Sequence, residues 1–423
     1  MPKINVLIFP AGEINSIELH DALASCVNIN VFGASSIDRH GGYVFENYIS
    51  GLPLITALDF FEKFNAILTE KNIDVIFPTH DTVATFLANN ADKIKAKIIT
   101  ADKRTSAICR DKQKTYEIFA DCDFIPKIYS KIDTYPVFIK PKEGQGAVGA
   151  KLLNSAKDIP DIDLHDYVIC EYLCGDEYTV DCLTDRNGDL RFVCPRSRKR
   201  IMAGVSVAGE IEKLTSEIQD IAEKINRRLS FLGLWWFQIK QDENGKWKLL
   251  EVCTRCAGTM ALTRAIGVNL PLLSVYIAMG YDISIEPNTY HVKMDSSLIR
   301  RYKIDYNYDT VYFDFDDTLT LRGNVNLKAI WFLYQCQNFG KKVVLLTKHE
   351  KEIYETMKSH HIDKGLFHEI IHIKPSDKKS DFINPNKAIF VDNAYQERAE
   401  VRRIYSIPVF DVDGLDVLMD WRY

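Results

Sequence analysis

Apolar runs alternate with amphipathic segments along the first hundred residues. The runs have the length and the Ile, Val and Phe content of buried strands, and apolar residues recur at helical spacing between them. Strands that alternate with helices form parallel sheets, since each helix returns the chain across the sheet. The pattern predicts a parallel α/β domain over residues 1–105, with strands at 4–9, 29–35, 73–79 and 97–100 and helices at 16–26, 59–72 and 83–94.

The middle of the chain has a different pattern, with longer strand-like runs that follow one another closely. The turn sequences Arg186-Asn187-Gly188-Asp189 and Glu243-Asn244-Gly245-Lys246 are typical of hairpins, which join antiparallel strands. We expect an α+β domain over residues 106–285, with strands at 135–141, 167–173, 177–185, 190–198, 234–242 and 246–253.

The last part of the chain returns to alternation after a polar, tyrosine-rich connector over residues 286–309. A third domain over residues 310–423 is predicted to contain another parallel sheet with covering helices. Its strands are expected at 310–315, 341–347, 369–373, 387–392 and 407–412, and its helices at 326–339, 351–361 and 394–404. The overall fold class is therefore multidomain, α/β and α+β.

Composition narrows the classes of protein that fit this pattern. The chain has 423 residues and a formal net charge of −5, which disfavours a nucleic-acid binder that neutralises phosphates. No apolar run reaches the length of a membrane span, and the first apolar run meets Pro10 and Gly12 as a strand would, unlike a signal peptide. Ten cysteines without framework spacing favour reduced thiols. We expect a cytoplasmic protein without nucleic-acid or membrane partners.

A glycine-rich loop follows the strand that ends in Lys140. Gly144, Gly146 and Gly149 would let backbone N–H groups approach phosphate oxygens, and the lysine would neutralise their charge. Taken alone, this loop is more typical of an ordinary hairpin beside a surface lysine than of a phosphate site. Other residues of the same domain favour the phosphate-binding interpretation.

Oxygen-bearing side chains occur on two strands that the hairpin turn pairs. Gln238 on one and Glu251 on the other could hold Mg²⁺ against a triphosphate, and Arg255 follows where it could stabilise developing charge. Glu171 and Glu177 flank a short apolar bridge that would suit adenine and ribose.

Residues 1–280 resemble the ATP-grasp superfamily, in particular its carbamoyl-phosphate-synthase-large-subunit-like branch. The resemblance is carried by "CRDKQKTYEIF", "FIKPKEGQGAVG", "CEYLCGDEYTVD" and "LLEVCTRCAG", which occur in the family's order. It implies ATP and Mg²⁺ as cofactors and a flexible lid over residues 143–149. The implied ATP contacts are Lys112, Lys140, Glu143, Gly144, Gly146, Gly149, Glu171, Leu173 and Glu177. Gln238 and Glu251 would be the metal ligands, and Arg255 would support an acyl phosphate.

One position departs from the family pattern. Cys253 stands where many members have a metal-binding asparagine, and a thiol is a poor ligand for Mg²⁺. The pair Cys253 and Cys256 has the spacing of a zinc or redox motif but lacks a second pair. In the basic run at residues 196–200, Arg196 and Arg198 could face an anionic substrate or phosphate, whereas Lys199 and Arg200 suit a solvated face equally well.

Three aspartates follow the first strand of the third domain. An acidic turn is the simplest interpretation of Asp314, Asp316 and Asp317, but later strands end in groups that would complete a phosphoryl-transfer site. One aspartate could attack phosphorus, a second could protonate the leaving group, and a hydroxyl and a lysine could bind phosphate. The candidates at these later strand ends are Thr347, Lys374 or Lys378, and Asp392, with Glu397 nearby.

Residues 310–423 resemble the haloacid-dehalogenase-like hydrolases, with the D-x-D-x-T motif at Asp314, Asp316 and Thr318. The resemblance implies a Rossmann-like α/β fold and a Mg²⁺ site formed by Asp314, Asp316 and Asp392. Asp314 would be the nucleophile and Asp316 the general acid and base. Thr347 and Lys374 or Lys378 would bind phosphate. Asn393 replaces a common acidic residue, and about 27 residues between successive motifs leave no room for either usual cap.

We therefore predict an ATP-dependent carboxylate–amine ligase that forms an acyl phosphate and carries a Mg²⁺-dependent phosphatase domain. Its partners would be small carboxylates and amines, with a homodimer as one option. Two alternatives stay open, a small-molecule kinase without amine ligation and a ligase whose last domain only caps it or mediates dimerisation.

Overall fold

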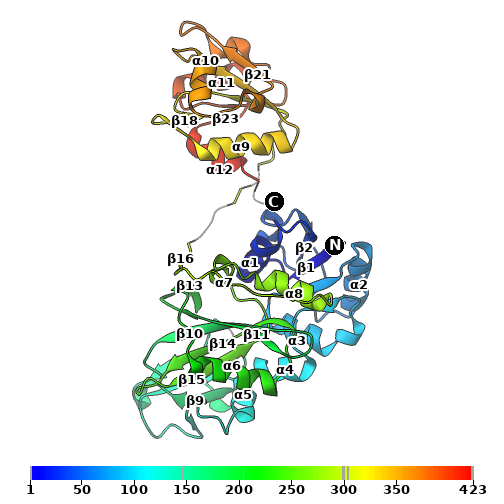
Figure 1. Ribbon diagram of the computed structural model, residues 1–423, viewed down its shortest axis with the longest axis vertical. Coiled ribbons are helices and arrows are strands. Elements are labelled where there is room, and N and C mark those ends of the chain that lie inside the picture. Colours follow the sequence, from blue (N-terminus) through cyan, green and yellow to red (C-terminus); the bar gives the residue numbers. More distant parts are fainter. Residues whose placement is uncertain (1, 145, 203, 298–300, 303, 421–423) are drawn as a thin grey trace. The chain divides into compact units, whose positions relative to one another are not determined.

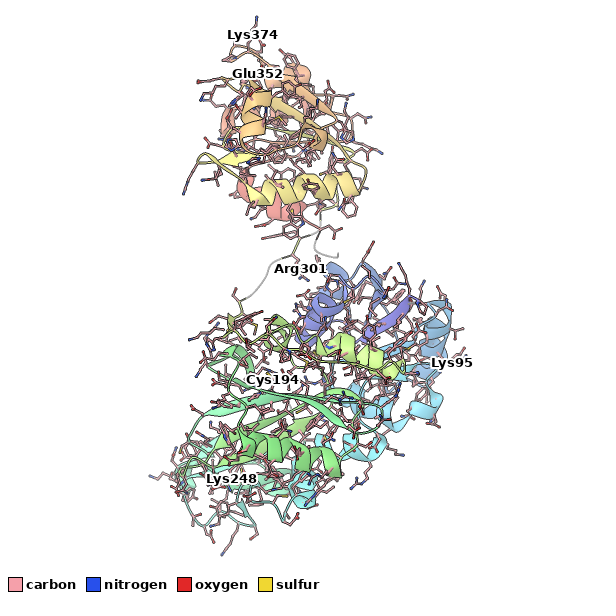
Figure 2. All side chains as sticks on the ribbon, in the orientation of Figure 1. Lys95, Cys194, Lys248, Arg301, Glu352 and Lys374 are labelled. Atoms are coloured by element: carbon pink, nitrogen blue, oxygen red, sulfur yellow. The ribbon has the colours of Figure 1, made fainter. Side chains whose placement is uncertain are left out.

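The computed structural model describes residues 2–144, 146–202, 204–297, 301–302 and 304–420. The chain divides into two compact units, residues 1–298 and 299–422, and the division falls within the predicted connector (Figure 1). Gln145 of the predicted lid and residues 421–423 of the predicted third domain lie outside the described residues. Side chains such as Cys194 lie in the interior, whereas Lys95 and Lys374 lie at the surface (Figure 2).

The first unit begins with the predicted parallel sheet, which is confirmed. Its strand order is β3-β2-β1-β4-β5, and every pair is parallel. Alternate residues of β1 pack in opposite directions, because Val6 and Ile8 join one apolar cluster and Leu7 and Phe9 another. The strands are β1 (Ile4–Phe9), β2 (Ile29–Ala34), β3 (Asn47–Ile49), β4 (Val75–Pro78) and β5 (Lys97–Ile98), and the helices are α1 (Ile14–Leu23), α2 (Phe60–Glu70), α3 (Asp81–Asn89) and α4 (Lys103–Arg110).

Two four-stranded antiparallel sheets follow, as the hairpin pattern predicts. The first has the order β11-β10-β14-β15, and its hairpins turn at Gly188 and Gly245, both with positive φ. The second has the order β6-β9-β7-β8. The strands are β6 (Ile128–Tyr129), β7 (Val137–Pro141), β8 (Lys151–Leu153), β9 (Tyr167–Glu171), β10 (Glu177–Thr184), β11 (Leu190–Ser197), β14 (Gly233–Gln241) and β15 (Trp247–Cys253).

The β11-β10-β14-β15 sheet separates a core from a polar face. Val180, Trp235 and Phe237 pack with the apolar stripe of α6 (Ser216–Arg228), and the alternate residues point away from this core. A small sheet of β12 (Arg200–Met202), β13 (Val205–Glu210) and β16 (Lys293–Asp295) and the helices α5 (Lys112–Ile118), α7 (Ala261–Ala265) and α8 (Leu270–Ala278) complete the unit.

The second unit contains a five-stranded parallel sheet in the order β21-β20-β17-β22-β23, as the alternation predicts. Between β17 and β20, the structure has only the short hairpin β18–β19 and the helix α9 among the described residues. The strands are β17 (Thr310–Phe313), β18 (Thr320–Leu321), β19 (Asn324–Val325), β20 (Lys342–Thr347), β21 (Glu369–His372), β22 (Ala388–Val391) and β23 (Val409–Phe410), and the helices are α9 (Leu327–Asn338), α10 (Ile353–Ser359), α11 (Tyr395–Tyr405) and α12 (Leu415–Leu418).

Across the described part of the chain, no helix combines the length and the apolar character that a membrane crossing needs. All ten cysteines are free thiols.

Candidate active site

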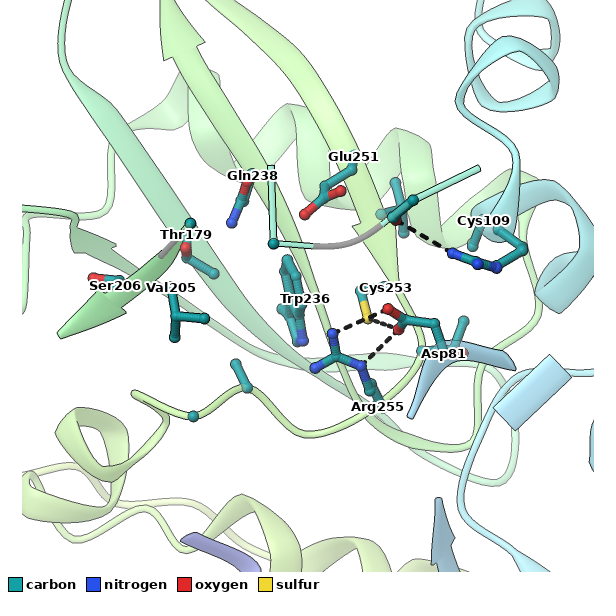
Figure 3. Close-up of a pocket in the computed structure, with 18 of the residues that line it drawn as sticks. Asp81, Cys109, Thr179, Val205, Ser206, Trp236, Gln238, Glu251, Cys253 and Arg255 are labelled. Carbon is teal, nitrogen blue, oxygen red and sulfur yellow. Dashed lines mark hydrogen bonds and ion pairs between the residues drawn. The ribbon is translucent and has the colours of Figure 1, made fainter. Parts of the chain in front are cut away.

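A polar cavity lies over the polar face of the β11-β10-β14-β15 sheet (Figure 3). It is lined by that sheet, by residues near α3, α4 and α5, by the glycine-rich segment after β7 and by the loop after β15. A second pocket adjoins it and shares Lys112, Gly144, Gln238 and Glu251. The cavity therefore gathers residues from all three parts of the first unit.

Strand register brings the two predicted metal ligands together. Gln238 on β14 stands directly opposite Glu251 on β15, and Thr179 on β10 stands opposite Gln238 from the other side. Residues opposite each other on antiparallel strands have Cβ atoms about 5 Å apart. Both oxygen-bearing side chains line the cavity, so the residues present fit a Mg²⁺ ion that takes its other ligands from phosphate and water.

A buried lysine and a half-buried lysine face the same space. Lys140 is 7% exposed, and its ammonium donates to the Tyr116 hydroxyl at 2.6 Å and to the Leu250 carbonyl at 3.0 Å. The Lys112 ammonium lies 3.8 Å from the Glu251 carboxylate. Burial lowers the pKa of both lysines, because few nearby charges offset the loss of hydration. An anionic ligand in the cavity would supply the missing counter-charge.

The glycine-rich segment has the backbone that its sequence predicts. Gly146 and Gly149 have positive φ, and a Cβ at Gly149 would come within 2.9 Å of the Pro141 ring. Gly146 packs against Gly204 at the β12–β13 turn so closely that a side chain at Gly204 would collide with its carbonyl group. The Arg110 guanidinium donates to the Gly144 carbonyl at 3.2 Å. Gly144 and Gly146 thus line the cavity.

The three residues predicted to hold adenine and ribose are arranged less favourably. The Glu171 carboxylate accepts a hydrogen bond from the Lys127 backbone N–H at 2.8 Å, and Leu173 is buried. Neither is among the described residues that line the two pockets. Glu177 does line the second pocket, but its carboxylate pairs with Arg198 at 2.7 Å and with Lys240 at 3.4 Å.

Arg255 lines the cavity in an ion pair that the sequence analysis missed. Its guanidinium contacts Asp81, the first residue of α3, with Nε 2.6 Å and Nη2 3.2 Å from the carboxylate oxygens. Burial by itself would raise the pKa of Asp81, but the guanidinium lowers it below the ordinary value. Asp81 follows β4 closely, and β1 and β4 adjoin where the strand order reverses, a position that often carries binding residues.

Cys253 also contacts this ion pair. Its sulfur lies 3.4 Å from the Asp81 carboxylate, and burial raises the pKa of the thiol well above its usual value. A neutral thiol is a poor ligand for Mg²⁺. Among the described residues, no three His, Cys, Asp or Glu side chains are placed to hold a metal ion, so the Cys-x-x-Cys spacing does not form such a site.

Most side chains of the basic run at residues 196–200 form ion pairs with acidic side chains of the protein. Arg196 and Arg198 both line the cavity, but the Arg196 side chain is 1% exposed and its guanidinium is already held by Asp181 at 2.7 Å and by Thr259. Arg198 pairs with Glu177, and Lys199 and Arg200 pair with acidic residues at the surface.

The second unit has a buried charge cluster at the carboxyl edge of its sheet. Asp314 follows β17 and Asp392 follows β22, the two strands between which the strand order reverses. The Lys379 ammonium lies 2.6 Å from an oxygen of each carboxylate. Burial raises the pKa of Asp314 to about 6, although Lys379 opposes this shift, and burial raises the pKa of Asp392 in the same direction.

The lysine at these aspartates is not one of the two predicted. Lys378 is exposed and pairs with Glu400 at 3.2 Å, and Lys374 is an exposed residue of the loop after β21. A short 3-10 helix over Lys379–Phe382 directs Lys379 inward instead. Lys374 and Lys378 are therefore corrected to Lys379.

The remaining predicted residues lie around this cluster. The Asp316 carboxylate contacts His349 Nδ1 at 2.9 Å, and the buried Thr347 hydroxyl accepts from the His349 backbone N–H at 3.2 Å. Asp317 has positive φ, in keeping with its interpretation as a turn residue. Glu397 pairs with Lys348 at 2.6 Å, and burial together with the Glu397 charge raises the pKa of Asp392.

Comparisons with known proteins bear on the first unit. A family model described as "ATP-grasp in the biosynthetic pathway with Ter operon" matches residues 163–301. The 3-methyl-D-ornithine–L-lysine ligase of Methanosarcina mazei is 27% identical over 153 residues. That stretch covers 36% of this chain and 40% of the relative, so the chain spans well under two thirds of the relative's length.

Solved structures show the same fold at low sequence identity. The biotin carboxylase domain of the 2-oxoglutarate carboxylase from Hydrogenobacter thermophilus, solved with MgADP, ADP and bicarbonate, has a TM-score of 0.54 at 16% identity, over 68% of this chain and 72% of that one. The L-amino acid ligase from Bacillus licheniformis has a TM-score of 0.53 at 15% identity, over 66% and 75%. The chain thus contains an ATP-grasp fold. These matches give no support to the haloacid-dehalogenase-like interpretation of the second unit, which remains a prediction.

Proposed function

We propose that residues 1–298 form an ATP-dependent ligase that phosphorylates a carboxylate and transfers the acyl group to an amine. The observation that carries this proposal is the cavity in which Lys112 and Lys140 face the opposed pair Gln238 and Glu251. The partial match to a ligase that joins two amino acids supports the carboxylate and amine substrates. Catalysis of this kind depends on positioning and on charge neutralisation.

Each cavity residue has a role in this reaction. Lys112 and Lys140 bind the ATP phosphates, whose charge is offset by the two ammonium groups. Gln238 and Glu251 would hold Mg²⁺, which neutralises phosphate charge when bound. The glycine-rich segment after β7 would exclude water from the acyl phosphate. Arg255 stabilises charge on the reacting carboxylate once the substrate competes with Asp81 for its guanidinium.

The test uses ATP, Mg²⁺ and a panel of carboxylic acids, with hydroxylamine as the acceptor amine. Wild type is expected to release ADP and form a hydroxamate with the matching acid. Glu251→Gln should lower the rate by about 100-fold or more, because it removes a metal-binding charge. Glu243→Gln, in the exposed turn of the same hairpin, is the matched control and should keep the wild-type rate. Equal rates for Glu251→Gln and wild type would refute the proposal.

A kinase that stops at phosphorylation is the alternative for this unit. It would accumulate a stable phosphorylated product and release ADP without any amine present. Hydroxamate formation distinguishes the two, since only an activated acyl group reacts with hydroxylamine.

For residues 310–423 we propose a second function, hydrolysis of a phosphate ester. The specific observation that favours it is the buried cluster of Asp314, Lys379 and Asp392 at the carboxyl edge of a parallel sheet. Asp314 would attack phosphorus, Asp316 would protonate the leaving oxygen, and Thr347 and Lys379 would bind phosphate oxygens. Asp314 and Asp392 would hold Mg²⁺ after Lys379 moves toward the phosphate.

The phosphatase proposal is tested with p-nitrophenyl phosphate and Mg²⁺. Asp314→Asn should abolish hydrolysis, because an amide cannot act as the nucleophile. Asp317→Asn, at the exposed turn next to the cluster, should leave hydrolysis unchanged. If wild type does not exceed Asp314→Asn, the second unit is a non-catalytic module.

A further inference from the structure

Two polar side-chain atoms on the floor of the cavity have no partner. The indole nitrogen of Trp236 and the hydroxyl of Thr179 are buried without a hydrogen bond to any described residue. Trp236 is 6% exposed and Thr179 is 2% exposed, and both line the cavity. Buried polar groups without partners are uncommon in native structures, and a ligand that the free protein lacks is one explanation.

The neighbouring Trp235 shows that a position on β14 does not by itself leave an indole nitrogen without a hydrogen-bond partner. Trp235 follows the same strand but points into the core on the opposite face, and its indole nitrogen donates to the Thr184 hydroxyl at 2.8 Å. The unsatisfied tryptophan is the one on the cavity side. The unpaired indole nitrogen is therefore a property of the cavity face of β14 and not of the strand as a whole.

The position of these two atoms is set by strand register. Thr179 stands opposite Gln238, and Trp236 lies two residues from Gln238 on the same face and opposite Cys253. The Arg255 guanidinium lies 5.7 Å from the centre of the Trp236 ring system (Figure 3). Trp236 thus lies beside Arg255, which would support the reacting carboxylate, and Thr179 lies beside Gln238.

The chemistry of the two groups restricts what can bind them. An indole N–H donates and cannot accept, so its partner must be an acceptor, and a threonine hydroxyl can donate to the same kind of group. In the proposed reaction, Arg255 stabilises the charge of the reacting carboxylate, and Gln238 and Glu251 would hold Mg²⁺. The Trp236 indole N–H and the Thr179 hydroxyl can then donate to a different oxygen of the substrate.

We propose that the acid substrate carries a second hydrogen-bond-accepting oxygen, a hydroxyl or another carboxylate, which binds the Trp236 indole N–H and the Thr179 hydroxyl. This inference rests on the proposed ligase function and specifies its substrate class. Trp236 and Thr179 would act as specificity-determining residues, because an acid without the second oxygen leaves both donors buried and unpaired.

The kinetic test compares acids that differ only by the second oxygen. The pairs are L-lactate with propionate, L-serine with L-alanine, and L-glutamate with 4-aminobutyrate, each assayed for acid-dependent ADP release. Wild type should prefer the acid with the extra oxygen in at least one pair. Trp236→Phe and Thr179→Val should each raise the KM for that acid about tenfold while changing the KM for its partner acid less than about twofold. The KM for ATP should not change.

Trp235→Phe is the matched control, because it removes an indole N–H from the core face of the same strand. It should leave the preference between the paired acids unchanged. An equal loss for both members of a pair in Trp236→Phe would show a packing role and overturn the inference. The ligase proposal would survive that result, since ADP release and hydroxamate formation would persist.

A binding measurement keeps the inference testable without turnover. The sequence contains five tryptophans, and the indole ¹⁵N–¹H signal that Trp236→Phe removes identifies Trp236. With MgADP present, the acid bearing the second oxygen should shift that signal, and its partner acid should shift it less. A shift without ADP release would refute the ligase and keep the subsite, whereas no differential shift with any pair would refute the subsite.

Discussion

The two parallel sheets of this chain have the same strand order but build their charged sites differently. In each, the order reverses between the first and the fourth strand, and an aspartate follows the fourth strand closely. Asp81 in the first sheet pairs with Arg255, which comes from the end of β15 in another part of the same unit. Asp392 in the second sheet pairs with Lys379 from the segment that precedes its own strand.

The two sites also differ in the exposure of their paired side chains and in the balance of acidic and basic groups. Asp81 and Arg255 have side chains that are 17% and 18% exposed, and one acid meets one base. At the second site, two almost completely buried carboxylates share a single lysine. The first site is balanced and accessible to a substrate, whereas the second holds an excess of buried negative charge that a cation would relieve.

The largest expected effect comes from removing the cation at each site. Lys379→Met should destabilise the second unit by about 3–5 kcal/mol, because two buried carboxylates lose the lysine that pairs with both of them. Arg255→Met should cost the first unit only about 1–2 kcal/mol, because solvent screens Asp81. Urea unfolding followed by hydrogen exchange of peptides from each unit separates the two values.

Restoring neutrality checks that charge is the cause. Adding Asp392→Asn to Lys379→Met should recover part of the lost stability. If the two single variants destabilise their units equally, the contrast between the sites is wrong.

The next effect is a difference between the two sites in how their stability responds to pH in the metal-free protein. Asp314 has a folded-state pKa of about 6, above its ordinary value of 3.8, so between these values the folded state binds more protons than the unfolded state. The second unit should therefore gain stability as the pH falls from 7 to 5, by about 1–3 kcal/mol. The pKa of Asp81 is lowered, so its stabilising contribution is kept until the pH falls below the ordinary aspartate value.

Unfolding midpoints of each unit in urea, measured with EDTA at pH 7, 6 and 5, would check this prediction. Asp314→Asn should reduce the gain in the second unit. A second unit that loses stability over this range would contradict the assignment of a raised pKa to Asp314.

The smallest effect concerns the position next to the first ion pair. Cys253→Asn should lower the Mg²⁺ concentration required for half-maximal ADP release by about threefold, because an amide oxygen binds Mg²⁺ better than a neutral thiol. Cys253→Ser is the matched control, since it removes the thiol without adding an amide. An unchanged Mg²⁺ requirement in Cys253→Asn would show that this position does not reach the metal.

Parts of the candidate site could be predicted because they depend on local patterns. A hairpin turn at Gly245 sets two strands side by side, and side-chain alternation then brings Gln238 and Glu251 to one face. Lys140 was predicted from its place at the end of a strand before a glycine-rich segment. The same alternation could have revealed that Arg196 faces Asp181 across neighbouring strands, but the exposed-looking basic run concealed it.

The sequence alone could not identify which charged residues pair with the aspartates of the two sites. Lys374, Lys378 and Lys379 are equally basic, and only the short helix that begins at Lys379 decides which ammonium reaches the aspartates. Asp81 lies 174 positions from Arg255, and no periodic pattern links residues that far apart.

The sequence by itself determined the elements, the parallel and antiparallel sheets and the strand ends at which polar groups emerge, because periodicity and turn chemistry act over short distances. Tertiary structure alone decided which charges meet and which donors remain unpaired. Burial and partner identity depend on segments that are distant in the chain, so the pairing of Asp81 with Arg255 and the unsatisfied indole of Trp236 appear only once the sheets are assembled.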